Sequence, residues 1–549
     1  MQLHDLVASL VDASTLQTLP NVSVRDVTVS SKRVRPASLF IALTGAETDG
    51  HHFVEEAIAR GAVAIVGDRT ESVWWHRVQG QHPRIPCIRV LDARAALVQL
   101  GQRFYDYPMT HLQLVGVTGT NGKTTTSFLV DHLLRARGAT VGLIGTVAYR
   151  CGDRQLPSTN TTPGQLELQA LFAQMVQRRI PWCVMEVSSH ALAQRRVEGL
   201  TFARAILTNV GSDHLDYHRT QEAYFAAKCR LFEQLEPGGR AVVNGDDPFG
   251  QRLMASLRAQ NGRGPQLVTF GLTPAADFWA SAWEYRWTGT SFHLHTPTAT
   301  FPVTTRLLGC HNILNVLAAV GCLWDHGWSC AQWQQMLAQF PGVPGRLELI
   351  PAGHDIRRGA GRPGGQDLRV VVDYAHTATA LEAAMLTVRS LQPRRVLVVF
   401  GCGGNRDRSK RPAMGRVAGR LADFVCLTSD NPRTEDPAAI AREVELGVRE
   451  TTTPYTSILD RGEAIAHTLA QAQPGDCVLI AGKGHETTQV LHDTVIPFDD
   501  RQVVRQWLVS ESAWEAGLTP SPACQPKAGD STSAQQSRPT FGGPRQVVG

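Results

Sequence analysis

The segment from Thr118 to Thr126 reads Thr-Gly-Thr-Asn-Gly-Lys-Thr-Thr-Thr, and it constrains the fold more than any other part of the chain. The apolar run Leu112 to Val117 before it predicts a buried strand. The residues from about Thr124 predict a helix, which Gly138 can terminate. Between a strand and a helix, glycines let backbone N–H groups approach phosphate, a lysine neutralises charge, and the next threonine binds magnesium. The segment therefore predicts a phosphate-binding loop.

This loop departs from the common pattern G-x-x-x-x-G-K-[ST], because Val117 stands at its first glycine and Gly116 comes one residue early. Taken alone, it also fits a glycine-rich turn that caps a helix and binds nothing. The strand before it and the helix after it are the context that a phosphate loop needs. The residues assigned to nucleotide phosphate on this basis are Gly119, Gly122, Lys123 and Thr124.

The length of 549 residues exceeds what one hydrophobic core supports, and the sequence patterns predict three α/β domains followed by a tail. Residues 1–108 alternate short β-rich runs with helical patterns. Residues 109–340 repeat strands and helices in the βαβ order of a parallel sheet. A turn-rich junction then introduces a third α/β region over residues 341–512. The polar residues 513–549 are expected to be a disordered tail.

Apolar and β-branched runs predict the individual strands. In the first two domains they cover residues 38–43, 62–66, 112–117, 182–187, 203–207 and 240–243. In the third they cover residues 370–372, 396–400, 424–427 and 477–480. Between the junction and the first of these, residues 351–367 are rich in glycine and arginine, so we expect an exposed hairpin loop there.

Composition excludes several classes of protein. Apolar residues make up 43% and charged residues 19%, as in an ordinary globular protein. The net charge of +5 is spread along the chain without a basic run, so no nucleic-acid partner is expected. Eleven cysteines without a Cys-x-x-Cys pair indicate a reducing compartment. With neither a secretory signal nor a membrane-spanning run, we expect a cytoplasmic protein, and we expect a monomer.

Several further motifs, taken with the loop, resemble the Mur ligases of peptidoglycan precursor synthesis. The matching motifs are Glu186-Val187-Ser188-Ser189-His190, Asn209 with Asp213-His214-Leu215-Asp216, His311-Asn312 with Asn315, Gly345-Arg346-Leu347-Glu348 and Asp373-Tyr374-Ala375-His376. Their order and spacing agree over about residues 20 to 505. The resemblance implies an N-terminal domain that binds a UDP substrate, a central phosphate-loop ATP-binding domain, a C-terminal Rossmann-like domain, and ATP-dependent amide-bond formation.

The resemblance also implies the nucleotide and metal sites. The residues expected to contact ATP, a co-substrate, are Gly119, Thr120, Asn121, Gly122, Lys123, Thr124, Thr125, Asn312, Arg346 and His376. One Mg²⁺ is expected on Thr124 and Glu186. A second is expected on His214 and on Lys228 carrying a CO2-derived carbamate, as N6-carboxylysine. Lys123, Glu186, His214 and Lys228 are the expected catalytic residues.

Each of these side chains has a simpler interpretation by itself. Glu186 could be a solvated carboxylate that caps the next turn. His214 and His218 could bind zinc as an H-x-x-x-H pair, although no third ligand stands at a suitable spacing. Lys228 lies in an amphipathic helical pattern that predicts an exposed lysine. A carbamate there makes chemical sense, since a lysine of depressed pKa near metals can add carbon dioxide.

The expected second substrate is UDP-N-acetylmuramoyl-L-alanyl-D-glutamate. The residues that match the positions contacting it in the family are Val29, Ser31, Asn160, Thr161, Thr162, Ser188, Gln194 and Arg196. A guanidinium suits its carboxylates and phosphates, because it binds such groups bidentately. Serines in loops are more often turn formers, and an arginine such as Arg196 is more often a surface ion-pair partner.

The amine substrate is predicted from the third domain. Asp430-Asn431-Pro432-Arg433 resembles the motif of the relatives that add meso-2,6-diaminopimelate, and lysine-adding relatives differ there. Diaminopimelate carries a second carboxylate that lysine lacks, so a site that selects it needs an extra cationic donor, which Arg433 supplies. The other expected contacts are Arg406, Gly482 and Glu486. Without the arginine, the motif would fit an ordinary turn.

These motifs predict a ligase that joins diaminopimelate to the γ-carboxylate of the D-glutamate through an acyl phosphate. Two departures are His311, where an aromatic residue is usual, and Thr377-Ala378-Thr379, where Thr-Pro-Asp is usual. A lysine-adding ligase, or a relative of folate polyglutamate synthases, is the alternative enzyme. A nucleotide-driven binding or motor protein is the alternative of another class, but it would not need two substrate sites.

Overall fold

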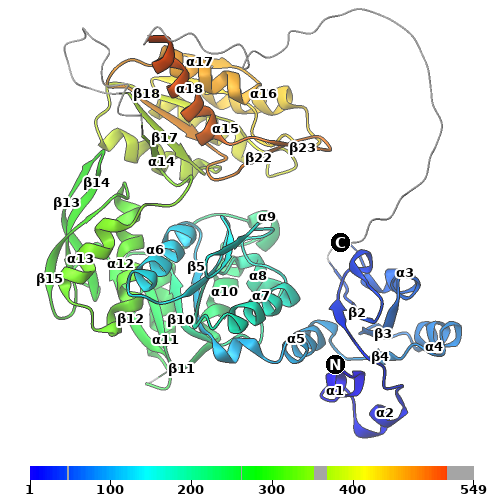
Figure 1. The fold of residues 1–549 in the computed structure, drawn as a ribbon. Coiled ribbons are helices and arrows are strands. Elements are labelled where there is room, and N and C mark those ends of the chain that lie inside the picture. The colour runs from blue at the N-terminus through cyan, green and yellow to red at the C-terminus, as the bar shows by residue number, and fades with distance from the viewer. Residues whose placement is uncertain (46–47, 261, 352–367, 516–549) are drawn as a thin grey trace, which may run out of the picture.

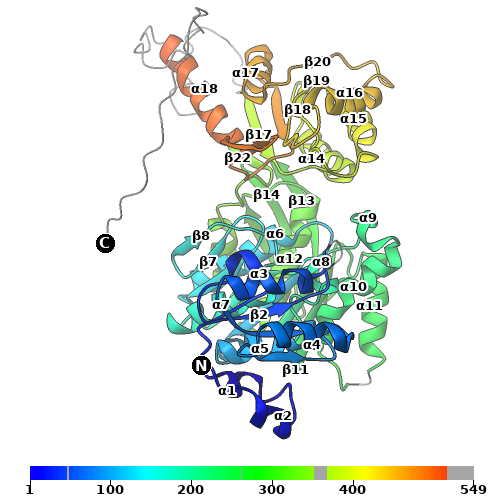
Figure 2. The same ribbon diagram turned by 90° about the vertical axis from the view of Figure 1, so that its right-hand side faces the viewer.

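The computed structural model describes residues 1–45, 48–260, 262–351 and 368–515, which form three α/β domains in chain order (Figure 1). The N-terminal domain lies beside the central domain, and the C-terminal domain lies above it, as the turned view also shows (Figure 2). The predicted fold class is confirmed. Each large sheet falls inside one predicted range, so we keep 1–108, 109–340 and 341–512 as the proposed boundaries.

The N-terminal domain is a four-stranded parallel sheet with helices on both faces. Its strands are β1 (Asp26–Thr28), β2 (Ser38–Ala42), β3 (Ala62–Gly67) and β4 (Cys87–Arg89). Its helices are α1 (Leu3–Val7), α2 (Ala13–Thr18), α3 (Val54–Ala59), α4 (Ser72–Gln81) and α5 (Ala93–Phe104), with 3₁₀ turns η1 (Ser31–Arg33) and η2 (Gly50–Phe53). Separate apolar clusters cover the two faces, which is why β2 is buried throughout.

The central domain contains an eleven-stranded sheet in the order β15-β14-β13-β12-β11-β10-β5-β9-β6-β7-β8. Its strands are β5 (Gln113–Thr118), β6 (Val141–Ile144), β7 (Tyr149–Cys151), β8 (Arg154–Leu156), β9 (Trp182–Glu186), β10 (Phe202–Leu207), β11 (Leu235–Asn244), β12 (Gln266–Gly271), β13 (Phe278–Arg286), β14 (Gly289–His295) and β15 (Thr300–Thr305). The middle strands are parallel, as predicted. Both edges add antiparallel strands that the βαβ rhythm did not predict.

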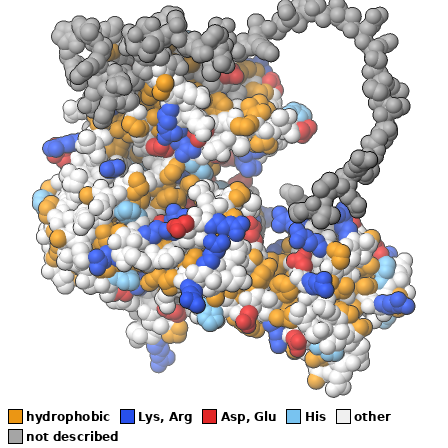
Figure 3. Space-filling model, viewed as in Figure 1, with side chains coloured by type: hydrophobic (Ala, Val, Ile, Leu, Met, Phe, Trp, Pro, Cys, Tyr) orange, Lys and Arg blue, Asp and Glu red, His pale blue; other side chains and the backbone are white. Residues whose placement is uncertain are grey.

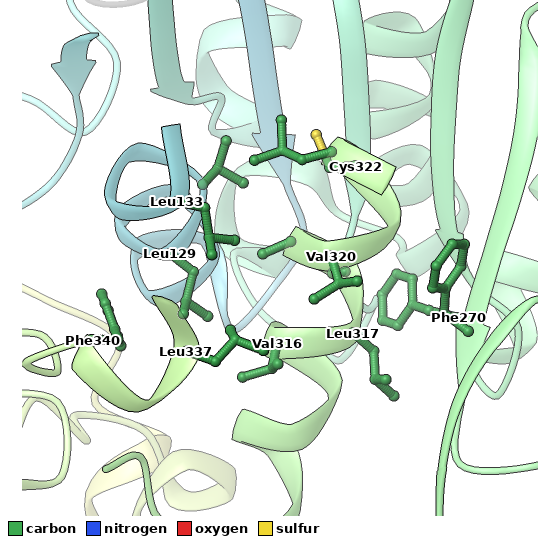
Figure 4. Close-up of a cluster of buried hydrophobic side chains, with 14 of the residues drawn as sticks. Leu129, Leu133, Phe270, Val316, Leu317, Val320, Cys322, Leu337 and Phe340 are labelled. Carbon is green, nitrogen blue, oxygen red and sulfur yellow. The ribbon is translucent and has the colours of Figure 1, made fainter. Parts of the chain in front are cut away.

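Helices cover both faces of this sheet. They are η3 (Pro108–His111), α6 (Lys123–Ala136), α7 (Gln165–Gln177), α8 (Ser189–Ala193), α9 (Leu215–His218), α10 (Gln221–Glu233), α11 (Pro248–Arg258), α12 (Cys310–Leu323), η4 (Trp324–His326) and α13 (Cys330–Gln339). On one face α6, α12 and α13 bring Leu133, Leu317 and Leu337 into one core (Figure 4). Truncating such a buried leucine to alanine typically costs about 2–5 kcal/mol.

The C-terminal domain is a six-stranded sheet in the order β16-β17-β21-β18-β19-β20, with a separate hairpin. The strands are β16 (Glu348–Ile350), β17 (Arg369–Asp373), β18 (Val396–Phe400), β19 (Phe424–Leu427), β20 (Tyr455–Ser457), β21 (Cys477–Ala481) and the hairpin β22 (Thr488–Leu491) and β23 (Thr494–Pro497). The helices are α14 (Ala378–Ser390), α15 (Lys410–Leu421), α16 (Pro437–Val448), α17 (Arg461–Gln471) and α18 (Asp500–Glu515). Apart from β16, the strands of the large sheet are parallel.

Parallel strands place their following loops at one edge of each sheet. In the central sheet Thr118 pairs with Leu207 of β10, and Val117 pairs with Glu186 of β9. In the C-terminal sheet Asp373 pairs with Ala481. The loops after β5, β9 and β10, and those after β17, β18, β19 and β21, therefore form two groups, and ligands of α/β sheets bind at such edges.

Polar contacts join the domains. Arg195 of the central domain forms an ion pair of 2.6 Å with Asp92, which also caps α5. The side chain of Gln102 donates to the carbonyl of Gly199 at 2.8 Å. On the other side, Arg346 of the C-terminal region donates to Thr124 Oγ1 at 3.2 Å. The phosphate-loop region is therefore in direct contact with the C-terminal part of the chain.

The expected strands named above are all present, with ends that differ by a few residues. Residues 513–515 are the end of α18 and not part of the tail, because the helix continues past residue 512. Residues 516–549 and 352–367, where a disordered tail and a hairpin loop are predicted, lie outside the described residues. Among the described helices, none combines the length and apolar character needed to cross a membrane. On the face in Figure 3, Lys and Arg are interspersed with Asp and Glu.

Candidate functional site

A cavity of about 410 Å³ lies between the central and C-terminal domains. The phosphate loop and the ends of the central strands form one wall, and the start of α12 forms another. Residues 373–384, which include the start of α14, close it from the C-terminal side. The cavity therefore brings together the two groups of loops that the sheet order predicts.

The conformation of the phosphate loop requires its glycines. Gly119 has a φ of 147° and Gly122 a φ of 86°. A Cβ atom at Gly119 would collide with Thr208 Oγ1, and one at Gly122 would collide with Asn315 Oδ1. The backbone N–H of Asn121 donates to Asn209 Oδ1 at 3.0 Å. The loop is therefore held in a fixed shape by the loop that follows β10 and by α12.

Lys123 is the first residue of α6 and lies against the loop. Its Nζ donates to the carbonyls of Gly119 and Thr120, both at 2.9 Å. Burial lowers the pKa of Lys123, and the charge of Glu186 partly offsets this effect. Two of the three ammonium hydrogens are used within the loop, so one is left for a bound phosphate.

Glu186 is fully buried at the end of β9 and is surrounded by donors. Thr124 Oγ1 donates to its Oε2 at 3.0 Å. Thr146 donates through its backbone N–H to Oε1 at 2.8 Å and through its hydroxyl to Oε2 at 3.0 Å. A Cβ at Gly145 would collide with Oε1. A hydroxyl and a carboxylate side by side at a phosphate loop are the oxygen ligands that Mg²⁺ prefers, so Thr124 and Glu186 fit such an ion.

His214 belongs to a cluster of histidine and tyrosine rings. Its backbone has a φ of 55°, and its ring lies 4.6 Å from that of His190 and 6.4 Å from that of Tyr224. Desolvation, together with the neighbouring His190, Lys123 and Lys228, lowers the pKa of His214 to about 4, against the opposing charge of Asp213. The imidazole is thus neutral at neutral pH, which is the form that binds a metal.

Lys228 corrects the prediction of an exposed lysine, since it is 1% exposed on α10. Lys228 lies on the buried face of α10, which also carries Tyr224, Leu231 and Phe232, and its Nζ lies 4.2 Å from the centre of the Tyr224 ring. Burial lowers the pKa of Lys228 well below its usual value, and the charge of Lys123 adds to this effect. A lowered pKa favours the uncharged amine, which is the form that reacts with carbon dioxide.

The zinc alternative finds no support in the geometry. Within the part of the chain that the structure describes, no three His, Cys, Asp or Glu side chains gather closely enough to hold a metal ion. His218 is buried with its ring 5.2 Å from that of Tyr224. The described cysteines are free thiols.

The remaining predicted nucleotide residues line the same cavity. Asn312 is buried at the start of α12, where it donates to the carbonyl of Leu308 at 2.8 Å and accepts from Asn315 at 2.8 Å. The guanidinium of Arg346 lies 4.4 Å above the ring of Tyr374. The backbone of His376 accepts from Lys410 at 2.9 Å. Thr120, Asn121, Thr125, Asn312, Arg346 and His376 all line the cavity.

Most residues predicted for the muramoyl dipeptide form a hydrogen-bonded group beside Glu186. The hydroxyl of Thr162 donates to the Glu186 carbonyl at 2.9 Å and accepts from the backbone of Ser188 at 3.0 Å. Arg196 donates to the Thr162 carbonyl at 2.8 Å and to Gln194 Oε1 at 2.7 Å and 3.0 Å. These residues therefore act as one unit next to the expected metal.

Two further residues of this set continue the group, and two lie elsewhere. Thr161 lies 3.0 Å from the hydroxyl of Thr146, and the backbone N–H of Asn160 donates to Tyr149 at 3.0 Å. Val29 and Ser31 lie in the N-terminal domain, and neither lines the cavity described above. Val29 is 41% exposed, whereas Ser31 is buried and donates to Glu56 at 2.8 Å.

The predicted amine residues come together at the carboxyl edge of the C-terminal sheet. Arg433 has a φ of 53°, and its Nη1 donates to the carbonyl of Gly404 at 2.7 Å. Its backbone pairs with the β22–β23 hairpin, donating to Val490 and accepting from His492. A Cβ at Gly482 would lie 2.8 Å from Asp430 Oδ2, so the two loops touch there. Glu486 accepts from Asn431 Nδ2 at 2.9 Å, and Arg406 is exposed.

Some residues of the site were not assigned from the sequence. Thr146 binds both carboxylate oxygens of Glu186, and Asp373 accepts from the backbone of Leu347 at 2.7 Å, which fixes Arg346. Lys483, which lies between the expected contacts Gly482 and Glu486, is fully buried against Glu486. The contacts of Thr146 and Asp373, and the bond from Lys483 to Asn431, join distant segments, so sequence spacing gives no signal for them.

Comparisons with known proteins find matches to all three domains. Three family models match the chain: Mur ligase family, catalytic domain, over residues 23–105; Mur ligase middle domain over 117–323; and Mur ligase, glutamate ligase domain, over 358–484. A protein of Geobacillus thermodenitrificans named UDP-N-acetylmuramoyl-L-alanyl-D-glutamate–2,6-diaminopimelate ligase is 44% identical, over 88% of this chain and 95% of its own.

Two further proteins carry the same name. One from Gloeobacter violaceus is 41% identical over 92% of this chain and 98% of its own. A solved structure of such a ligase is 33% identical with a TM-score of 0.60, and the match covers 89% of this chain and 95% of that chain.

Proposed function

Since the chain belongs to the Mur ligase family, we propose that it adds meso-2,6-diaminopimelate to UDP-N-acetylmuramoyl-L-alanyl-D-glutamate, with ATP as the energy source. The observation that carries this proposal is the Asp430-Asn431-Pro432-Arg433 motif, in which Arg433 is proposed to supply the second cation that diaminopimelate requires. Relatives that are 41% to 44% identical are named for this reaction. A lysine-adding ligase or a folate ligase would not need the cation.

The first chemical step is attack of the D-glutamate γ-carboxylate on the γ-phosphate of ATP. An O–P bond forms to the carboxylate, and the bond to the ADP oxygen breaks. Lys123 and Arg346 are placed to offset charge at the phosphates, because one lies in the loop and the other reaches Thr124. The amine of diaminopimelate then attacks the acyl phosphate, and phosphate leaves as the amide forms.

The proposed residues for ATP are Gly119, Thr120, Asn121, Gly122, Lys123, Thr124, Thr125, Asn312, Arg346 and His376. Bound Mg²⁺ would offset negative charge on the phosphates during transfer, and Thr124 and Glu186 would hold one ion. The second set is His214 and Lys228. As an ammonium, Lys228 would repel a cation, so we propose that its amine adds carbon dioxide and releases a proton, which gives a carbamate anion.

The two other substrates are assigned to the remaining groups. Val29, Ser31, Asn160, Thr161, Thr162, Ser188, Gln194 and Arg196 are proposed to contact the UDP-muramoyl dipeptide. Arg406, Asp430, Asn431, Pro432, Arg433, Gly482 and Glu486 are proposed to contact diaminopimelate.

The free thiols suit a reducing compartment, so we propose that the enzyme works in the cytoplasm, as a monomer and without nucleic acid.

Amine-dependent phosphate release tests the proposal. The purified chain is supplied with ATP, Mg²⁺ and the UDP-muramoyl dipeptide, and phosphate is measured with meso-diaminopimelate, with L-lysine, and with neither. Diaminopimelate should give the fastest release. Faster release with lysine, or equal release in all three reactions, would contradict the proposed function.

A further inference from the structure

The distribution of lysines draws attention to one buried side chain outside the nucleotide site. Of the 54 lysines and arginines, only six are lysines, so the positive charge of the chain is carried mainly by arginine. Two of the six, Lys123 and Lys228, belong to the proposed catalytic set. A third, Lys483, has a side chain that is 0% exposed. Lysine is almost never fully buried unless it is paired, so this position needs an explanation.

The contacts of Lys483 supply it. Its Nζ donates to Glu486 Oε2 at 2.7 Å, to Asn431 Oδ1 at 3.2 Å and to the carbonyl of Thr488 at 2.7 Å. All three ammonium hydrogens are therefore used. Glu486 Oε2 also accepts from Asn431 Nδ2 at 2.9 Å. Among the described residues no hydrogen bond reaches Glu486 Oε1. Oε2 is therefore held by Lys483 and Asn431, and Oε1 is left to accept from a ligand.

We propose that Lys483 is a positioning and specificity residue for the amine substrate. It holds Glu486 so that Oε1 can accept from the distal ammonium, and it adds a positive charge behind that carboxylate. This inference rests on the proposed function and deepens it. Lys483 acts through Glu486 and Asn431, and its ammonium has no hydrogen left to give to the substrate.

Charge explains how Lys483 affects the choice of amine. The side chains proposed to contact diaminopimelate, taken together with Lys483, include three cations, Arg406, Arg433 and Lys483, and two anions, Asp430 and Glu486, so this set has a net charge of +1. The distal end of diaminopimelate carries an ammonium and a carboxylate, which cancel. The distal end of lysine carries an ammonium alone, which a positive site repels. Removing the Lys483 charge would remove most of this repulsion.

A separate buried arginine, Arg461, supports the backbone of the loops that follow β19 and β21. The effect of Lys483 on the side chains in these loops can therefore be measured by itself. Arg461 donates to the carbonyls of Ser429, at 3.3 Å, and Ala481, at 2.9 Å, which are the residues just before the two loops. Its fully buried guanidinium is paired with Asp500 at 2.7 Å. Replacing Lys483 should therefore disturb the side chains of Glu486 and Asn431 more than the path of the loops.

The test is Lys483→Met, assayed with diaminopimelate and with L-lysine as alternative amines. The KM for diaminopimelate should rise about tenfold, while the KM values for ATP and for the UDP-muramoyl dipeptide stay the same. The preference for diaminopimelate over lysine should fall by about tenfold or more, since the repulsion of lysine is also lost. If Lys483→Met does not fold, Lys483→Gln removes the same charge and is judged by the same outcomes.

A matched control and a double variant separate this role from a structural one. Arg395→Met breaks an ion pair of 2.6 Å with the buried Asp476, at the opposite end of β18 and β21. It should lower stability without changing the amine preference. In a Glu486→Gln background, Lys483→Met should change the preference by a smaller factor than in the wild type, because the two residues act together.

The outcomes distinguish the two proposals. A wild-type enzyme that does not use diaminopimelate would contradict the proposed function itself. A wild-type enzyme that uses it, together with a Lys483→Met variant of unchanged amine preference, would overturn only the role of Lys483. Equal factors in the two backgrounds would also overturn it, since Lys483 would then not act through Glu486.

Discussion

The phosphate corner of the central domain and the amine loops of the C-terminal domain are built in different ways. At the phosphate corner the functional side chains bind one another, as Thr124, Thr146 and Glu186 do at 2.8–3.0 Å. In the amine loops the expected substrate contacts, such as Arg406 and Arg433, are partly exposed. Beneath them lie the fully buried side chains of Lys483 and Arg461, which bind Glu486 and the backbone of the amine loops.

This difference separates two tasks. A corner whose side chains already hold one another suits a reacting group that is the same in every turnover, namely the ATP phosphates. Exposed cations above a fixed buried layer suit a choice between amines. The residue that contacts the amine can be exchanged without changing the buried side chains that support it. Variants at the two places should therefore change different measurements, and the predictions below test that separation.

The largest expected effect is on the layer beneath the amine loops. Arg461→Met leaves Asp500 as an unpaired buried carboxylate and also removes donors from two backbone carbonyls. The free energy of unfolding should fall by about 3–5 kcal/mol, as measured by urea denaturation. A loss below about 1 kcal/mol would show that this layer does not support the loops.

Lys123→Ala should affect the other region. The variant removes the ammonium that lies against the phosphate loop, so kcat should fall by about 10²–10³, or about 3–4 kcal/mol. The preference for diaminopimelate over lysine, measured from the residual activity, should not change. A changed preference would mean that the two regions are not separate.

Arg433→Ala should give the converse result. The variant removes the cation proposed to bind the distal carboxylate, so kcat/KM for diaminopimelate should fall by about 2–4 kcal/mol. Binding of ADP, measured by titration calorimetry, should stay the same. Equal losses in both measurements would indicate damage to the fold, and not to amine selection.

The smallest expected effect is at Thr146. Thr146→Val removes the hydroxyl that donates to Glu186 but keeps the backbone donor, so magnesium-dependent binding of ADP should weaken by about 1.5–3 kcal/mol. Thr146→Ser restores the hydroxyl and should recover most of the affinity. Failure of the serine variant to do so would show that the hydroxyl bond is not what matters.

The residues of the phosphate corner could be predicted from the sequence more completely than the buried residues that support the two sites. The loop between a strand and a helix, and Glu186 at a strand end, have local signals. Lys228 does not, because a lysine in an amphipathic helix is expected on the exposed face, whereas it lies on the buried face of α10 with Tyr224 and Leu231. Thr146 and Asp373 make these contacts across the fold, as Lys483 does with Asn431, so no spacing in the sequence marks them. The antiparallel edges β7–β8 and β13–β15 were missed for a related reason, since the predicted βαβ rhythm describes only parallel strands.

The most direct test of the account is a competition between the two amines. Equal concentrations of meso-diaminopimelate and L-lysine are supplied with ATP, Mg²⁺ and the UDP-muramoyl dipeptide, and the products are identified by mass. The account predicts that nearly all of the tripeptide product contains diaminopimelate, and that Arg433→Ala reduces this excess. A product that contains mainly lysine would contradict the assignment of Arg433 and the function built on it.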